Sequence, residues 1–147
     1  MVVLALMAVV LWPALRERTV VEAFPSPVAA PAVETSQSPP AGPVVVSRGT
    51  FHGIGHRASG QAVVYRLAGR LVLRFEGISF QGTPTPVVHL VAAGARSPGG
   101  GVRIGGLKGE HGSFGYDLPA GAPAVRVLVW CQRYAVPIAA ADLTEVR

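Results

Sequence analysis

The sequence is poor in residue types that often define a protein class: it has one cysteine, one lysine and no asparagine among its 147 residues. Because a disulfide within the chain needs two cysteines and a cysteine-rich zinc site needs more, the single Cys131 excludes an intramolecular disulfide and such a zinc site. Charged residues make up 14% of the chain and hydrophobic residues 50%, a balance that excludes a disordered acidic chain. The length fits one domain, or one domain with an appendage.

The net charge of +5 comes from the second part of the chain. Residues 48–147 contain eleven basic and five acidic residues, a balance of +6, whereas residues 1–47 contain two basic and three acidic residues, a balance of −1. A basic domain favours phosphate groups or an anionic membrane surface. The arginines are nevertheless spaced one or two at a time with no interleaved aromatic platform, so we expect solvated strand faces and no nucleic-acid partner.

The chain begins with an apolar run, Met1–Leu15, that contains no charge and is followed by Arg16 and Arg18. As a helix it would span about 22 Å, less than the roughly 30 Å hydrocarbon core of a bilayer. No basic residue precedes the run, and Val21-Glu22-Ala23 is only a weak match to a signal-peptidase site. The arginines follow the run, on the side that the positive-inside rule assigns to the cytoplasm. We interpret residues 1–18 as a membrane anchor or signal segment, preferring an anchor whose first basic residues precede this start site; the alternative is a buried helix of the globular domain.

A proline-rich tract follows and accounts for most of the predicted linker, residues 19–47. Residues 24–43 contain six prolines, which fix φ and remove backbone donors, so neither a helix nor a central strand is expected there. The composition is typical of a semi-extended spacer that holds a folded module away from a membrane, or of a disordered tail with no task.

Residues 48–147 are predicted to form a single all-β module, an antiparallel β-sandwich or barrel of about 7–8 strands, because short alternating segments are separated by Gly and Pro. Leu71, Leu73 and Phe75 are expected to point inward, as are Val63, Tyr65 and Leu67. Ala68-Gly69 has the length of a two-residue hairpin loop. The strands are expected at residues 62–67, 70–76, 86–91, 102–107, 112–118, 124–131 and 134–139.

Cys131 ends one of these strands. Val125, Val127, Val129 and Cys131 share one face, and the other face carries Arg126, Leu128 and Trp130. If the valine face is the core, Cys131 is a buried and inert thiol. A reactive thiol would require an electropositive and partly exposed setting, and the residues alone leave both alternatives open.

The other candidate metal and catalytic groups are four histidines. His52 and His56 have the four-residue spacing of helical ligands, but the glycines between them disfavour a helix, so no metal site is predicted. His89 lies inside an apolar strand, where a half-buried structural histidine is expected. The sequence contains no Gly-x-Ser-x-Gly elbow, P-loop or dinucleotide fingerprint, so we expect a non-enzymatic redox or binding module. The fourth histidine is His111.

Several segments of the folded module resemble the DM-thirteen domain family, from about Arg48 to Leu143. The most specific is Trp130-Cys131 followed by an aromatic residue and a valine, and the second is His56-x-x-Ser59-Gly60. The resemblance extends to residues 18–25, which are similar to the stretch just outside the membrane helix of bacterial members. The remaining matching segments are Gly49-Thr50-Phe51, Leu71–Phe75 and Ile104–Gly109.

The resemblance implies a membrane-anchored β-sandwich outside the cytoplasm, with a secreted protein as the alternative. It also implies electron transfer through Cys131, as a free thiol or a haem ligand, with His56 as a candidate cofactor-binding residue and a redox protein as partner. Family members usually carry Gly-Pro-Asp before the strand at residues 86–91, whereas this chain has Gly82-Thr83-Pro84-Thr85-Pro86. The alternative function is a non-catalytic cell-surface binding or adhesion module with a buried structural Cys131.

Overall fold

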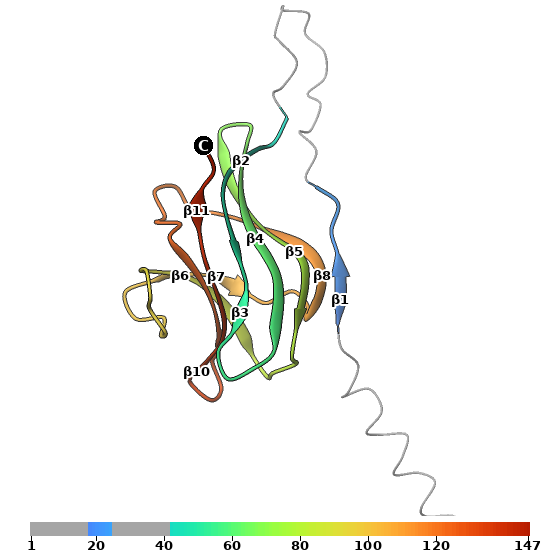
Figure 1. Ribbon diagram of the computed structural model, residues 1–147, viewed down its shortest axis with the longest axis vertical. Helices are drawn as coiled ribbons and strands as arrows, with labels where there is room; N and C mark the ends of the chain where they lie inside the picture. Colours follow the sequence, from blue (N-terminus) through green and yellow to red (C-terminus); the bar gives the residue numbers. More distant parts are fainter. Residues whose placement is uncertain (1–17, 25–41) are drawn as a thin grey trace, which may run out of the picture.

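The computed structural model describes residues 18–24 and 42–147, and this part of the chain is all-β (Figure 1). It contains no helix, and 58% of it is strand. No helix in this part is therefore long and apolar enough to span a membrane. The apolar helix predicted within residues 1–18 lies outside the described residues, apart from Arg18.

The strands form two sheets that lie against each other in an open, sandwich-like arrangement. The first sheet has six strands in the order β1-β8-β5-β4-β2-β11, and the second has five in the order β3-β10-β9-β6-β7. All neighbours are antiparallel except β1 and β8, which are parallel. The strands are β1 (Thr19–Val21), β2 (Val44–Thr50), β3 (His52–Gly53), β4 (Ala58–Leu67), β5 (Arg70–Phe80), β6 (Pro86–Val91), β7 (Val102–Gly106), β8 (His111–Asp117), β9 (Arg126–Cys131), β10 (Val136–Asp142) and β11 (Thr144–Glu145).

The predicted all-β, sandwich-like fold is confirmed, and the seven expected strands correspond to β4–β10. The structure adds β1, β2, β3 and β11, so the described residues hold eleven strands. Two of the additions change the predicted linker: β1 occupies its first residues and β2 begins at Val44. Both segments are rich in β-branched valine, which favours strands, but β1 is too short to show a periodic pattern.

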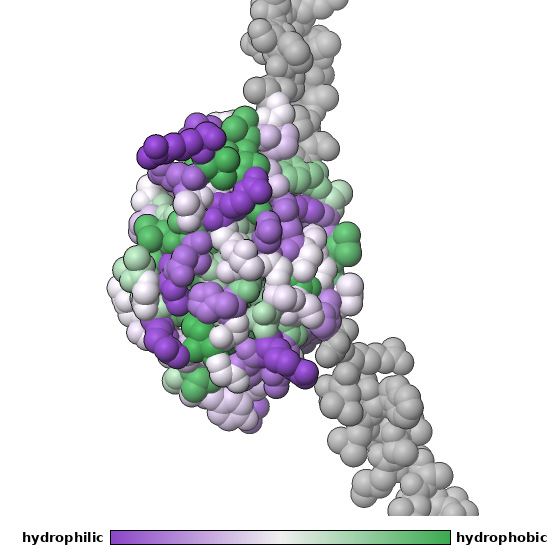
Figure 2. Space-filling model, in the orientation of Figure 1, coloured by the Kyte–Doolittle hydropathy of each residue, from purple (hydrophilic) through white to green (hydrophobic). Residues whose placement is uncertain are grey.

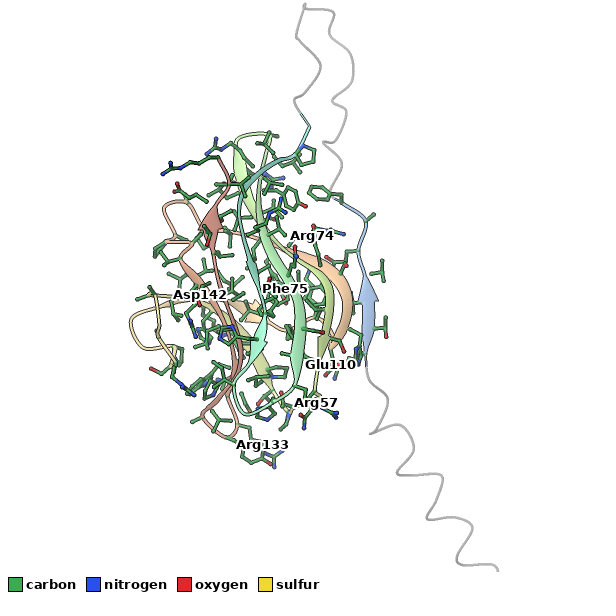
Figure 3. All side chains as sticks on the ribbon, in the orientation of Figure 1. Arg57, Arg74, Phe75, Glu110, Arg133 and Asp142 are labelled. Atoms are coloured by element: carbon green, nitrogen blue, oxygen red, sulfur yellow. The ribbon has the colours of Figure 1, made fainter. Side chains whose placement is uncertain are left out.

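The core lies between the sheets and centres on Phe75 of β5 (Figure 3). Leu73 and Phe75 are fully buried, as the alternation predicted. The prediction for β4 is confirmed only in part: Val63 and Leu67 are buried, but Ala62 and Val64 are the residues that enter the core cluster. The Tyr65 hydroxyl instead donates a 2.7 Å hydrogen bond to Glu76 on the outer face. Burial and this hydrogen bond raise the pKa of Tyr65 to about 12, so the phenol stays protonated and keeps donating.

The β4–β5 hairpin turns through Ala68 and Gly69, as predicted, and both residues have positive φ, 48° and 77°. This geometry suits the two-residue turn that matches the twist of antiparallel strands. Glycine adopts it freely, but an alanine in the left-handed region is strained by roughly 1 kcal/mol.

Ala68→Asn should therefore stabilise the protein by about 0.5–1 kcal/mol, because asparagine tolerates the left-handed region and Asn-Gly is a preferred pair in this turn. Denaturant unfolding of the variant and the parent chain measures the difference. Ala120→Asn, in an exposed turn without positive φ at that residue, serves as the matched control and should change little. Equal effects of the two substitutions would contradict the strain at Ala68.

Residues 18–24 are an integral part of the domain, fastened to the free edge of β8. Their backbone pairs with β8, and the Glu22 carboxylate accepts hydrogen bonds from Lys108 Nζ at 2.8 Å and from the Gly115 N–H at 3.0 Å. Arg74 donates to the Glu22 carbonyl at 2.7 Å and stacks on the Phe24 ring, 5.0 Å from its centroid. The Lys108 and Gly115 hydrogen bonds lower the pKa of Glu22. We call residues 18–24 the strap.

Glu22→Gln should lower the free energy of unfolding at pH 7 by about 1 kcal/mol, a value discounted because the Glu22 and Lys108 side chains are 40% and 38% exposed. Since the pKa of Glu22 is lowered in the folded state, its stabilisation is present above its ordinary value of 4.5 and is lost as the pH falls through the folded value. The difference between parent and variant should accordingly shrink between pH 7 and pH 3 in denaturant titrations. Glu145→Gln is the charge-matched control, and a similar loss there would contradict the specific role of Glu22.

Candidate functional site

Cys131 lies at the end of β9 with its side chain in the core between the sheets. The residue is 1% exposed and belongs to the cluster that contains Val127 and Val129, so this face of β9 points into the core between the sheets. Its thiol donates a hydrogen bond to the Pro84 carbonyl, with 3.1 Å between Sγ and O. The thiol is therefore a small core group that is hydrogen-bonded to a backbone carbonyl.

Two loops meet where β9 ends near Cys131: residues 81–85, which precede β6, and residues 132–135, which join β9 to β10. Thr85 connects them, because its carbonyl accepts from the Gln132 N–H at 3.1 Å and its Oγ1 accepts from the Arg133 N–H at 3.0 Å. Thr85 and Ala135 have φ of 47° and 52°, a strained conformation for side chains of this kind. These contacts hold the loop that supplies the carbonyl of Pro84.

Arg133 and His56, two basic residues that could act on the thiol, have other contacts. The Arg133 guanidinium lies over the Tyr134 ring, 5.7 Å from its centroid, and the His56 Nδ1 lies 3.4 Å from the Ile54 carbonyl. Among the described residues no ion pair or hydrogen bond joins either side chain to Cys131. Figure 3 nevertheless places Arg57, beside His56 in the chain, at the same end of the domain as Arg133.

A haem iron does not fit at Cys131 as the structure presents it. The Sγ atom is enclosed by apolar side chains and faces a carbonyl, so a macrocycle would have to displace loop 81–85 to reach it. No group of three or more histidine, cysteine or acidic residues able to hold a metal ion occurs within residues 18–24 and 42–147.

His89 is half-buried in β6, as expected for a structural histidine. Burial, with a smaller contribution from the charge of Arg103, lowers the pKa of His89 and keeps the imidazole neutral at pH 7. His52 lies in β3 and His56 in the loop that follows, so their four-residue spacing is not helical.

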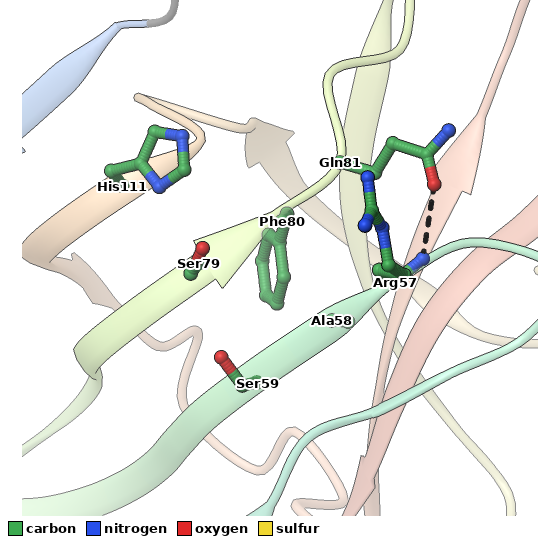
Figure 4. Close-up of a pocket in the computed structure, with 7 residues that line it drawn as sticks. All are labelled: Arg57, Ala58, Ser59, Ser79, Phe80, Gln81 and His111. Carbon is green, nitrogen blue, oxygen red and sulfur yellow. Dashed lines mark hydrogen bonds between the residues drawn. The ribbon is translucent and has the colours of Figure 1, made fainter.

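A shallow cleft of about 340 Å³ opens between the adjoining ends of β4, β5 and β8 (Figure 4). Arg57 and Gln81 stand on one side, joined by a 3.2 Å hydrogen bond from the Arg57 backbone N–H to Gln81 Oε1, and His111 stands on the other. Ser59 and Ser79 add hydroxyl groups between them, and both residues are exposed. The cleft can therefore offer hydrogen bonds, but its polar side chains are not fixed by burial.

A second cleft, of about 370 Å³, lies over the outer face of the five-stranded sheet. Its lining includes His52, Arg96 and Arg126, and Arg126 is 7% exposed. The sequence did not predict this site, because its arginines were expected to lie on solvated strand faces. One sequence feature indicates that Arg126 is buried. It lies within the hydrophobic run of residues 124–131, where both faces of the strand carry large apolar residues.

On the face shown in Figure 2, hydrophilic and hydrophobic residues are interspersed in small groups. Comparison of the chain with family models, with curated proteins and with solved structures found no match.

Proposed function

We propose that this chain is a non-enzymatic binding module of the DM-thirteen type, held at a membrane outside the cytoplasm by residues 1–18, in which Cys131 is structural. The observation that carries the structural role is the environment of the sulfur: 1% exposed, packed with Val129 and hydrogen-bonded to the Pro84 carbonyl. A thiol becomes a nucleophile or ligand through its thiolate, which needs water or a positive charge nearby. Neither Arg133 nor His56 supplies that charge to Sγ.

The strap supports the tethered arrangement. It follows directly on residues 1–17 and is joined to the domain by the Glu22–Lys108 ion pair and the Arg74 contacts. A membrane segment preceding Arg18 would accordingly be connected to the folded sheet by two residues, Arg16 and Glu17, and not by the proline-rich tract.

Electron transfer through Cys131 is the second candidate, favoured by one feature of the covering loop. Thr85 is a β-branched residue with positive φ, and strained residues of this kind are often found at functional sites. Movement of loop 81–85 would break the Pro84 contact and open the sulfur to a redox partner or haem iron.

Thiol alkylation separates the two functions. With a structural Cys131, a maleimide should modify the native full-length chain at least about 100-fold more slowly than the denatured chain, because reaction requires local opening of roughly 3 kcal/mol or more. Cys131→Ala carrying Ser97→Cys, in an exposed loop, is the control and should react equally fast in both states. Rapid native reaction of Cys131, or a Soret band in protein purified from haem-supplied cells, would establish the redox candidate instead.

The location is tested with the same control chain in intact cells. A membrane-impermeant maleimide should label the introduced thiol of the Cys131→Ala/Ser97→Cys chain without permeabilisation, because the domain is proposed to lie outside the cytoplasm. The chain should also remain in the membrane fraction after carbonate extraction, whereas a deletion of residues 2–15 should release it. Labelling only after permeabilisation would contradict the proposed location, and extraction of the intact chain would contradict the anchor.

A further inference from the structure

The strongest unassigned site is the cleft over the outer face of the five-stranded sheet. Its floor is Arg126 at the start of β9, and its sides come from β3 with the following residues 54–55 and from loop residues 94 and 96 between β6 and β7. In Figure 3, Asp142, the ion-pair partner of Arg126, marks this side of the domain on β10.

Arg126 is held rigidly and has spare hydrogen-bonding capacity. Its Nη1 donates to Asp142 Oδ1 at 2.7 Å, while its buried Nε–H has no hydrogen-bond partner within the described residues. A guanidinium carries five N–H donors, and a buried charge with unused donors is costly unless another group or water completes its shell. The single carboxylate beside it is itself 59% exposed, so it compensates the charge only in part.

The other lining groups are complementary to the same kind of ligand. His52 and Arg96 add an imidazole and a second guanidinium, and the lining contains no carboxylate. Gly55 and Gly94, both with φ of 73°, also line the cleft. Two guanidinium groups and an imidazole therefore line one cleft of about 370 Å³.

We infer that this cleft binds a small oxyanion, a phosphate, sulfate or carboxylate group, with Arg126 as the fixed anchor and Arg96 and His52 as adaptable contacts. Arginine pairs with such groups through two parallel hydrogen bonds, which a point charge cannot provide. The inference adds a ligand class to the proposed binding function. It rests on that function, because it takes this cleft as the place where the module binds its ligand.

Trp130 provides the reporter. It packs in the same outer-face cluster as Ile54 and Ala95, which belong to the two loops of the cleft. The chain has two tryptophans, so Trp12→Phe leaves Trp130 as the single source of tryptophan fluorescence.

The experiment titrates the full-length Trp12→Phe chain with inorganic phosphate, sulfate, acetate and glycerol phosphate at constant ionic strength. At least one oxyanion should give a saturable change in Trp130 fluorescence, and Arg96→Gln should weaken that binding about 10-fold through loss of a charged hydrogen bond. Preference for glycerol phosphate would indicate that the bound phosphate group is carried on an organic molecule. Preference for inorganic phosphate would indicate that the bound phosphate is free. Either result supports an oxyanion site in this cleft.

Two controls make the result specific. Arg103→Gln, on β7 and outside the cleft lining, removes the same charge and should leave binding unchanged, as should Arg57→Gln in the cleft of Figure 4. Because Arg96 is exposed on a loop, its variant is expected to fold, which circular dichroism verifies. The inference is overturned if no oxyanion gives saturable binding, or if either control weakens binding as much as Arg96→Gln. Failure here leaves the alkylation and labelling results untouched, so it is distinguishable from failure of the proposed function.

Discussion

The packing of aromatic rings around Phe75 is the interaction on which the rest of the domain depends. The Phe75 ring lies 4.8 Å from Phe51, 5.3 Å from Phe114 and 5.6 Å from Tyr116, measured between centroids, in edge-on or tilted geometry. These contacts join the strands of the six-stranded sheet beneath the second sheet, whose inner face adds Val127, Val129 and Cys131 to the same cluster. Interiors of this density tolerate little change in volume, so the inward face of every central strand is committed to packing. The side chains that are free to bind a ligand or to react therefore lie at the strand ends, in the loops and on the outer faces.

Cys131 lies where the packed core meets a strand end. Its position at the end of β9 is therefore compatible with a structural thiol or with a reactive one. Its neighbours Val127 and Val129 place the sulfur inside the aromatic core, and the Pro84 carbonyl satisfies its single hydrogen. The segment that supplies this carbonyl, residues 82–86, contains no carboxylate. Here a backbone carbonyl oxygen occupies the contact, and as a hydrogen-bond acceptor it pairs with the thiol and not with a thiolate. The local structure accordingly favours stability over reactivity at this thiol.

The sequence predicted the central strands well and the outer-face site poorly, for definite physical reasons. Alternation over Leu71–Phe75 follows from the pleat of a strand and gave the correct face. The pairing of Arg126 with Asp142 could not be predicted by counting residues from the β9–β10 turn, because the register shifts by one residue between Pro137 and Ala139. With the register of Cys131 and Val136 continued unchanged, Arg126 would face Ala141. Pro137 lacks the N–H that a regular ladder requires, and such bulges depend on tertiary packing that local patterns do not encode.

The strap changes the meaning of the proline-rich tract. As a spacer, residues 25–41 would separate a membrane segment from the domain; with the strap fastened to β8, they instead connect β1 to β2, two strands of one sheet. If Met1–Leu15 enter a membrane as proposed, the two residues before Arg18 can span only about 7 Å even when fully extended. The edge of the six-stranded sheet would then lie close to the lipid surface. The Glu22–Lys108 pair and the Arg74–Phe24 stack would set that distance, and the attachment to the membrane would be short.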